Sequence, residues 1–326
     1  MKHENGIEVN GLYKSFGKVK VLKNVNFRVK KGAIVALLGP NGAGKTTTIN
    51  ILSTLLKPDE GTAYIAGHEI TKDPASVRAA VGLTGQFAAV DEYLTGHENL
   101  KMIGRLYHMK SGIEDKAQEL LKQLELTDDA NRPVRTYSGG MKRKIDLAMS
   151  LIASPTIIFL DEPTTGLDPR SRVGLWNIIK ELAAQGKTIL LTTQYMEEAE
   201  HLADNIIVID HGTVIAEGTA QELKRKVGAE RVEIVFKKKA DFDKALELFK
   251  GKQTNADQNS LTLNITAKRG GSAVMKETID HLDRAKINPA SLALRQPTLD
   301  DVFLTLTGHQ ATETEVKPKK EKGAKK

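Results

Sequence analysis

The chain has 326 residues, 40% of them apolar, and a net charge of +7, so we expect one large domain and a smaller one. It contains no cysteine, which excludes disulfides and thiolate metal sites. The polar start, 1–6, lacks the apolar core of a signal peptide, and no apolar run approaches the ~20 residues that a membrane span requires. We therefore expect a protein that is soluble or peripheral to a membrane.

Part of the positive charge lies in residues 311–326, which hold six lysines and three glutamates. We expect this Lys-rich tail to be disordered and solvated; weak attraction to anionic lipid headgroups is the alternative. The rest of the chain is mildly basic for its size, so its charge does not demand a nucleic-acid partner, and none is expected.

The first elements along the chain are predicted antiparallel strands. Apolar alternation places them at Ile7–Val9, Val19–Val21 and Val25–Val29, with glycines between them. Phe16 lies in this segment. By itself it favours a core position, and stacking on a purine base is the alternative.

A glycine-rich segment follows an apolar strand, Ile34–Leu38, and precedes a helical pattern, Thr46–Leu56. It fits the phosphate-binding pattern G-x-x-x-x-G-K-S/T. Its residues are Gly39, Pro40, Asn41, Gly42, Ala43, Gly44, Lys45, Thr46 and Thr47. The glycines allow backbone N–H groups to point at phosphate, Lys45 supplies charge, and the Thr46 hydroxyl can ligate Mg²⁺. The flanking strand and helix argue against the alternative, a turn that binds nothing.

The next region, about 87–152, is predicted to be a helical insert. A capping box at Thr95 begins a helix that runs toward His108, and a second helix covers Ile113–Leu126. A third helix, Arg143–Ile152, is opened by a short polar and glycine-rich segment. That segment is Ser138, Gly139, Gly140, Met141 and Lys142.

An apolar run at 156–160 predicts a buried parallel strand that ends in Asp161 and Glu162. Asp161 can hold Mg²⁺, and Glu162 can orient and deprotonate a water for attack on a γ-phosphate. The alternative is an acidic loop, which the upstream phosphate-binding loop makes the weaker interpretation. The next predicted elements are a helix at 171–184 with Trp176 in the core, a buried strand at 187–193 that ends at Gln194, and a hairpin at 206–216.

From residue 230 the pattern changes to a small α+β domain. Predicted strands cover 232–236, 261–265 and 292–294, and predicted helices cover 242–249, 272–285 and 298–306, with Thr298 as an N-cap. A further strand near Lys252 would complete a βαββαβ, ferredoxin-like unit. This domain shows no catalytic constellation. We expect a packing or dimer-stabilising role, and regulation or substrate sensing is the alternative.

The ordered motifs of residues 7–227 closely resemble those of the ABC-type ATPases. The motifs are the phosphate-binding loop, Gln86, Ser138–Lys142, Asp161–Glu162, Gly166–Asp168 and the polar Gln194. The resemblance implies an α/β P-loop ABC ATPase fold with an antiparallel β subdomain and a helical insert in 1–227, a small α+β domain in 228–310, and ATP and Mg²⁺ as cofactors.

The resemblance also implies roles for single residues. Phe16 would stack on adenine, Gln86 would sense Mg²⁺ and contact a membrane partner, Glu162 would be the catalytic base, and Asp168 would cross a dimer interface. In this family, Ser138, Gly139 and Gly140 of one chain complete the phosphate-binding loop of another. Because the chain has one copy of each motif, a dimer with a second copy or a related ATPase subunit follows.

One position departs from the family pattern: Gln194 stands where the family usually has histidine. Glutamine can bond to a γ-phosphate oxygen and to water, but it cannot carry charge or shuttle a proton. We therefore expect that the pH profile of the ATPase activity shows no pKa that belongs to this position.

Four segments resemble the daunorubicin-resistance type of ATP-binding subunit. They are 192–199, 137–144, 85–91 and 296–303. This resemblance implies export through a separate integral membrane subunit at the cytoplasmic face of the cell membrane, without identifying the cargo.

Two other functions compete with an exporter motor. A soluble ABC ATPase that acts on nucleic acid, ribosomes or cofactor assembly is disfavoured by the single cassette and the lack of a long coiled-coil insert. A nucleotide-regulated binding module without turnover is disfavoured because Lys45, Asp161 and Glu162 are all present.

Overall fold

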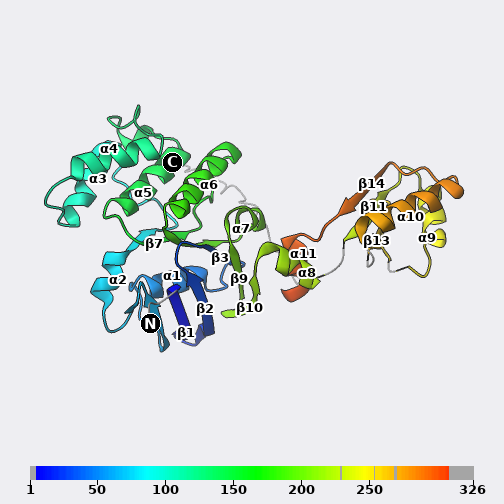
Figure 1. Cartoon of the computed structure of the whole chain (residues 1–326), viewed down its shortest axis with the longest axis horizontal. Helices are drawn as coiled ribbons and strands as arrows, with labels where there is room; N and C mark the ends of the chain where they lie inside the picture. Colours follow the sequence, from blue (N-terminus) through cyan, green and yellow to red (C-terminus); the bar gives the residue numbers. More distant parts are fainter. Residues whose placement is uncertain (1–4, 228–229, 253, 268–269, 308–326) are drawn as a thin grey trace, which may run out of the picture. The chain divides into compact units, whose positions relative to one another are not determined.

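The computed structural model describes residues 5–227, 230–252, 254–267 and 270–307, so the predicted Lys-rich tail lies outside the described residues. The chain divides into two compact units at Ala216/Glu217, the second ending at Leu306 (Figure 1). The boundary expected at 227/228 stays a prediction.

A six-stranded sheet forms the centre of the first unit. Its order is β10 (Thr213–Gly218), β9 (Asn205–Asp210), β3 (Ile34–Leu38), β8 (Thr188–Thr193), β7 (Ile157–Asp161) and β6 (Val81–Thr84). The strands from β9 to β6 are parallel, and every residue of β3, β7 and β8 is buried. Continuous apolar runs predict this double-sided burial. The carboxyl ends of parallel strands share one edge, and that edge carries the site.

A second, antiparallel sheet lies in the same unit. Its order is β2 (Val19–Lys30), β1 (Asn5–Phe16), β4 (Glu60–Ile65) and β5 (His68–Glu69). The prediction of three short strands in 7–29 was wrong, because β1 and β2 are each 12 residues long. The register shifts between Val9 and Leu12, so Gly11, with a φ of 61°, marks a bulge rather than a break.

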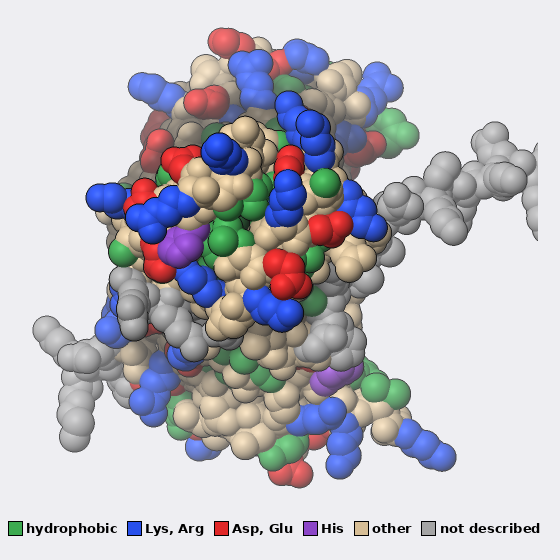
Figure 2. Space-filling view, turned by 90° about the vertical axis from the view of Figure 1, so that its right-hand side faces the viewer, with side chains coloured by type: hydrophobic (Ala, Val, Ile, Leu, Met, Phe, Trp, Pro, Cys, Tyr) green, Lys and Arg blue, Asp and Glu red, His purple; other side chains and the backbone are tan. Residues whose placement is uncertain are grey.

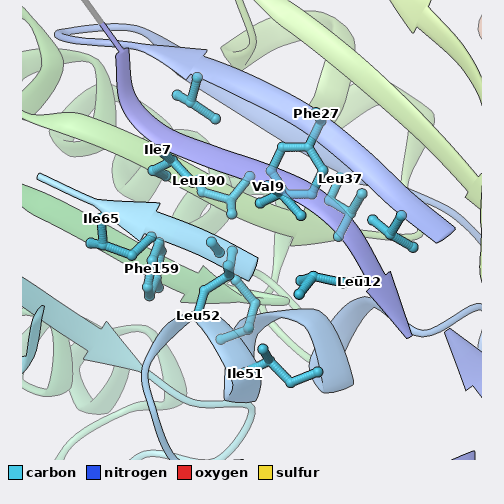
Figure 3. Close-up of a cluster of buried hydrophobic side chains, with 14 of the residues drawn as sticks. Ile7, Val9, Leu12, Phe27, Leu37, Ile51, Leu52, Ile65, Phe159 and Leu190 are labelled. Atoms are coloured by element: carbon cyan, nitrogen blue, oxygen red, sulfur yellow. The ribbon is translucent and has the colours of Figure 1, made fainter. Parts of the chain in front are cut away.

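The main core lies between this sheet, α1 (Lys45–Leu52) and the central sheet (Figure 3). Ile7, Val9 and Phe27 from β1 and β2 belong to one cluster with Ile51 and Leu52 of α1, and all five are at most 4% exposed. Leu37, Phe159 and Leu190 of the central strands belong to the same cluster. The core therefore fixes the helix that follows the phosphate-binding loop against both sheets.

Figure 1 shows the helices of the first unit, the largest group of them on the side of the central sheet away from β1 and β2. They are α1 (Lys45–Leu52), α2 (Pro74–Ala80), α3 (Gly96–Leu106), α4 (Ile113–Gln123), the 3₁₀ turn Val134–Thr136, α5 (Gly139–Leu151), α6 (Pro169–Ala184) and α7 (Met196–Leu202). The capping box at Thr95 is confirmed: its hydroxyl accepts from Glu98 N, and Glu98 accepts from Thr95 N. The helix expected at Thr46–Leu56 ends at Leu52, before Thr54 at a φ of 65°.

The second unit contains a four-stranded antiparallel sheet. The order is β12 (Thr254–Asp257), β13 (Thr262–Thr266), β11 (Arg231–Val235) and β14 (Ser291–Arg295). The helices are α8 (Ala220–Val227), α9 (Lys239–Leu248), α10 (Gly271–Arg284) and α11 (Leu299–Thr307). Phe242 of α9 and Leu282 of α10 share a core with Val232 and Ile234, so these helices cover one face of the sheet. The expected small α+β fold is confirmed, and the Thr298 hydroxyl accepts from Asp301 N at 3.1 Å.

The face shown in Figure 2 mixes Lys and Arg with Asp and Glu side chains, so this face carries no uniform basic patch. Across the described parts of the chain, no helix is both long enough and apolar enough to cross a bilayer.

Candidate functional site

The phosphate-binding loop joins β3 to α1, as its pattern predicts. Gly42 and Gly44 have φ values of 83° and 106°, which favour glycine. A Cβ at Gly39 would come within 2.2 Å of the Ile209 carbonyl oxygen, so this position has no room for a side chain. No side chain caps the first turn of α1. The loop therefore leaves N–H donors at a positive helix end, which suits a phosphate.

Lys45 is the first residue of α1 and is 4% exposed. Its Nζ donates to the carbonyls of Gly39 at 2.9 Å and Pro40 at 3.1 Å, and lies 3.2 Å from Glu162 Oε1. Burial lowers the pKa of Lys45, and the Glu162 carboxylate opposes that shift. The structure thus brings together the two residues that the sequence assigned to phosphate binding and to proton abstraction.

Asp161 and Thr46 form the second pair. The Thr46 hydroxyl donates to Asp161 Oδ1 at 3.3 Å, and Thr192 Oγ1 donates to the same oxygen at 2.5 Å. A carboxylate and a hydroxyl are the hard oxygen ligands that Mg²⁺ prefers. Within the described ranges, no group of three or more His, Asp or Glu side chains could hold a metal ion.

Glu162 follows β7 in a turn with an unusual backbone. Its φ is 49°, a left-handed conformation that costs a non-glycine residue about 1–2 kcal/mol. Its N–H donates to Thr192 Oγ1 at 3.0 Å, and its Oε2 accepts from Thr165 Oγ1 at 3.3 Å. The residue is 7% exposed. A strained turn with fixed partners indicates that its carboxylate direction is set by the surrounding fold.

Gln194 and Gln86 follow strands at this same edge of the sheet. Gln194 comes directly after β8, whose Thr193 carbonyl accepts from Gly39 N at 3.2 Å, so its backbone adjoins the phosphate-binding loop. Gln86 follows β6 and is exposed. The register pairs Thr84 with Leu160, which puts the segment of Gln86 beside that of Asp161 and Glu162.

The glycine-rich segment at 138–140 forms a separate group with Asp168. Ser138 is the N-cap of α5, and its hydroxyl accepts from Met141 N at 3.3 Å. Asp168 caps α6 by accepting from Ser171 N at 3.0 Å, and a Cβ at Gly140 would meet Ser171 Oγ at 2.6 Å. Hydrogen bonds from Ser171 lower the pKa of Asp168. The N-termini of α5 and α6 thus form one surface, which is apart from the contacts of the phosphate-binding loop.

Phe16 ends β1 and is 50% exposed, so its placement in the core was wrong. Lys14 Nζ lies 5.7 Å from the ring centroid. The exposed ring leaves a face available for a planar base.

Comparison with known proteins agrees with this geometry. The ABC transporter family profile matches residues 22–165. The daunorubicin resistance ATP-binding protein DrrA3 of Streptomyces coeruleorubidus is 44% identical over 94% of this chain and 96% of its own. The doxorubicin resistance ATP-binding protein DrrA of Mycobacterium tuberculosis is 46% identical over 92% of this chain and 93% of its own.

The chain belongs to the ABC transporter family of ATP-binding proteins. As an ABC ATP-binding protein it is an ATPase whose hydrolysis is coupled to transport. A solved ABC cassette, described as a dimer in a post-hydrolysis state bound to ADP and Pi, has a TM-score of 0.60 and 28% identity. That match covers 65% of this chain and 98% of the cassette. A second profile, for the C-terminal domain of DrrA1-3-like ATP-binding proteins, matches residues 218–307.

Three buried charged residues of this ABC cassette were not predicted from the sequence. Arg143 and Asp146 of α5 and Glu198 of α7 are 7%, 4% and 1% exposed, and none stands in a pattern that predicts burial. Glu198 Oε1 accepts from Thr164 Oγ1 at 2.8 Å and Trp176 Nε1 at 3.1 Å. Trp176 is therefore buried as predicted, and it also donates a hydrogen bond to Glu198. The one available signal was the single tryptophan, whose N–H requires a partner when buried.

Replacing Glu198 by glutamine is expected to reduce the loss of stability with rising pH. Burial raises the pKa of Glu198, so the folded chain holds a proton that the unfolded chain releases above pH ~4.5. Stability from this group is therefore present at low pH and declines as pH rises through the folded pKa. Glutamine cannot ionise, although its buried N–H₂ costs about 1–3 kcal/mol at every pH. Urea unfolding followed by Trp176 fluorescence at pH 5, 6.5 and 8 measures the difference.

Glu197→Gln is the matched control, because Glu197 lies on the same helix but its side chain is 72% exposed. The Trp176 ring lies 4.7 Å from the His201 ring, and both variants retain this contact, so its effect on fluorescence cancels. A free energy of unfolding for Glu198→Gln that runs parallel to wild type across the pH range would contradict the prediction.

Proposed function

We propose that this chain is the ATP-driven motor of an exporter and works with a separate integral membrane subunit at the cytoplasmic face of the cell membrane. The supporting observation is the convergence of Lys45, Thr46, Asp161 and Glu162 at one edge of the central sheet. Fixed phosphate-binding, metal-binding and base groups distinguish a hydrolase from a binding module without turnover.

In the proposed reaction, the β- and γ-phosphates of ATP accept hydrogen bonds from the N–H groups of the phosphate-binding loop and from the Lys45 ammonium. Thr46 and Asp161 would hold Mg²⁺, with Gln86 as a further ligand, and Mg²⁺ would neutralise phosphate charge. Glu162 accepts a proton from the attacking water. Gln194 bonds to that water and to a γ-phosphate oxygen without taking the proton.

The proposed active unit is a dimer with a second copy or a related ATPase subunit. Ser138, Gly139 and Gly140 present a helix N-terminus next to Asp168, on a surface that is available to another chain's nucleotide. Phe16 would stack on the adenine. ATP that binds the closed dimer better than the open one drives closure, and hydrolysis releases it.

The cargo proposed is a drug, antibiotic or lipid-like molecule, because the relatives in Streptomyces and Mycobacterium carry daunorubicin and doxorubicin resistance in their names. The cargo site would lie mainly in the membrane subunit. For the second unit we propose a role in packing or dimer stability. The alternative of a soluble ABC ATPase on nucleic acid finds no support in the mixed charges of the face in Figure 2.

The test is a tagged pull-down of Glu162→Gln from solubilised membranes with Mg-ATP. This variant keeps the shape of the base but stops proton abstraction, so the closed complex should persist. One integral membrane protein at a fixed ratio supports the proposal. The double variant Glu162→Gln, Lys45→Ala is the matched control, because it should lose both nucleotide and partner. Recovery of ribosomes or nucleic acid instead would overturn the exporter function and leave the ATPase chemistry intact.

A further inference from the structure

Arg143 is a buried cation whose partners are mainly backbone carbonyls. It lies in the second turn of α5, the helix that begins next to Ser138. Its Nε donates to the Pro163 carbonyl at 2.8 Å, and its Nη2 donates to the carbonyls of Asp161 at 3.0 Å and Glu162 at 3.2 Å. One planar guanidinium therefore bonds to three successive carbonyls. Lysine, with a single nitrogen, cannot reproduce this fork.

The same guanidinium reaches a second segment. Its Nη1 donates to the Gly85 carbonyl at 2.7 Å, the residue before Gln86. The carboxylate of Asp146, one turn further along α5, lies 3.5 Å from Nη1 and accepts from Ala89 N at 3.0 Å. The segment 85–89 is thus tied to α5 at both of its ends.

These hydrogen bonds of Arg143 lie around the turn that holds Glu162. Glu162 has a φ of 49°, and such a turn persists only where its surroundings hold it. Arg143 donates to the carbonyls of Asp161, Glu162 and Pro163. On the neighbouring strand β8, Thr192 Oγ1 accepts the N–H of Glu162. A shift of the turn would move the carboxylate away from the attacking water.

We propose that Arg143 is a positioning residue for ATP hydrolysis: it holds the turn that presents Glu162 and ties it to the segment of Gln86 and to the helix of Ser138. A movement of either element then changes the direction of the carboxylate. This inference rests on the proposed role of Glu162 as the base. Arg143 itself touches neither substrate nor metal in this assignment.

The experiment is a double-mutant cycle between Arg143→Lys and Glu162→Gln in the full-length chain, with ATP as the substrate. Arg143→Lys should lower kcat about 10- to 100-fold, the range for a misplacement near 1 Å, and leave KM for ATP within about twofold. In the Glu162→Gln background, the same change should lower single-turnover hydrolysis no further, because the base through which Arg143 acts is already gone.

Arg78→Lys is the matched control, because Arg78 is an exposed arginine that donates to Thr54 Oγ1 at 3.1 Å and should leave kcat unchanged. Should Arg143→Lys fail to fold, Asp146→Asn replaces it, since it removes the charge beside Arg143 and keeps an acceptor for Ala89 N. An unchanged kcat, or an equal loss in both backgrounds, would overturn the proposal. Full turnover by Glu162→Gln alone would instead remove the base assignment, which separates the two failures.

Discussion

Replacing Glu162 by glutamine is expected to lower the rate of ATP hydrolysis by about 10²- to 10⁴-fold, the usual contribution of a positioned general base. Glutamine preserves the size of the side chain and one oxygen acceptor for Thr165, but it cannot accept a proton from water. ATP should still bind, because the N–H groups of the phosphate-binding loop and Lys45 are unchanged. Phosphate release by the full-length chain measures the rate, and gel filtration with Mg-ATP measures the dimer.

Glu181→Gln, an exposed change on α6, is the control and should leave both measurements at the level of wild type. A variant at Glu162 that hydrolyses ATP at more than half the normal rate would show that another group takes the proton.

Lys45→Ala is expected to weaken ATP binding roughly 10- to 150-fold, because a hydrogen bond to a charged group contributes about 1.5–3 kcal/mol. The change also leaves Glu162, which is 7% exposed, without the ammonium that lies 3.2 Å from it. The rate of hydrolysis should fall together with the affinity for ATP. It should not recover at saturating ATP, since the Lys45 cation also offsets charge on the γ-phosphate. Calorimetric titration with ATP and with ADP measures both affinities.

Lys187→Ala provides the comparison for a partly buried lysine. Lys187 also donates to a backbone carbonyl, that of Pro155 at 2.6 Å, but it precedes β8 and so lies at the opposite end of the strand from Thr193. It should bind ATP normally. If Lys45→Ala binds ATP within twofold of wild type, the phosphate-binding role of Lys45 is wrong.

Local patterns predicted the elements that carry the phosphate-binding loop. An apolar strand, a glycine-rich turn and a helix are signals within about 25 residues, and the capping box at Thr95 is a signal within four. Short helices were not predicted from the sequence, because a short pattern is weak: α2 and α7 have seven residues each. Asp73 and Pro74 were a usable sign for α2, since Asp73 Oδ1 accepts from Ser76 N at 3.2 Å and Pro74 stands at the first turn.

The sequence predicts the partners of some site residues but not of others. Lys45 and Glu162 could be paired in advance because each ends a strand–loop motif at the same edge of a parallel sheet. Arg143 could not, because its partners are backbone carbonyls, which every residue has. Phe16 was placed wrongly when judged alone, because it is the last residue of β1, where the strand leaves its side chain exposed.

The ion pair between Lys45 and Glu162 joins the two groups on which the proposed hydrolysis depends. The same ammonium is the proposed ligand of the phosphates and the ion-pair partner of the proposed base. It also donates to two carbonyls of its own loop. In the proposed mechanism, the phosphates of ATP would compete with the Glu162 carboxylate for that ammonium, so nucleotide binding would also release the proposed base. Glu162 would then be free to accept a proton from water only once ATP is bound.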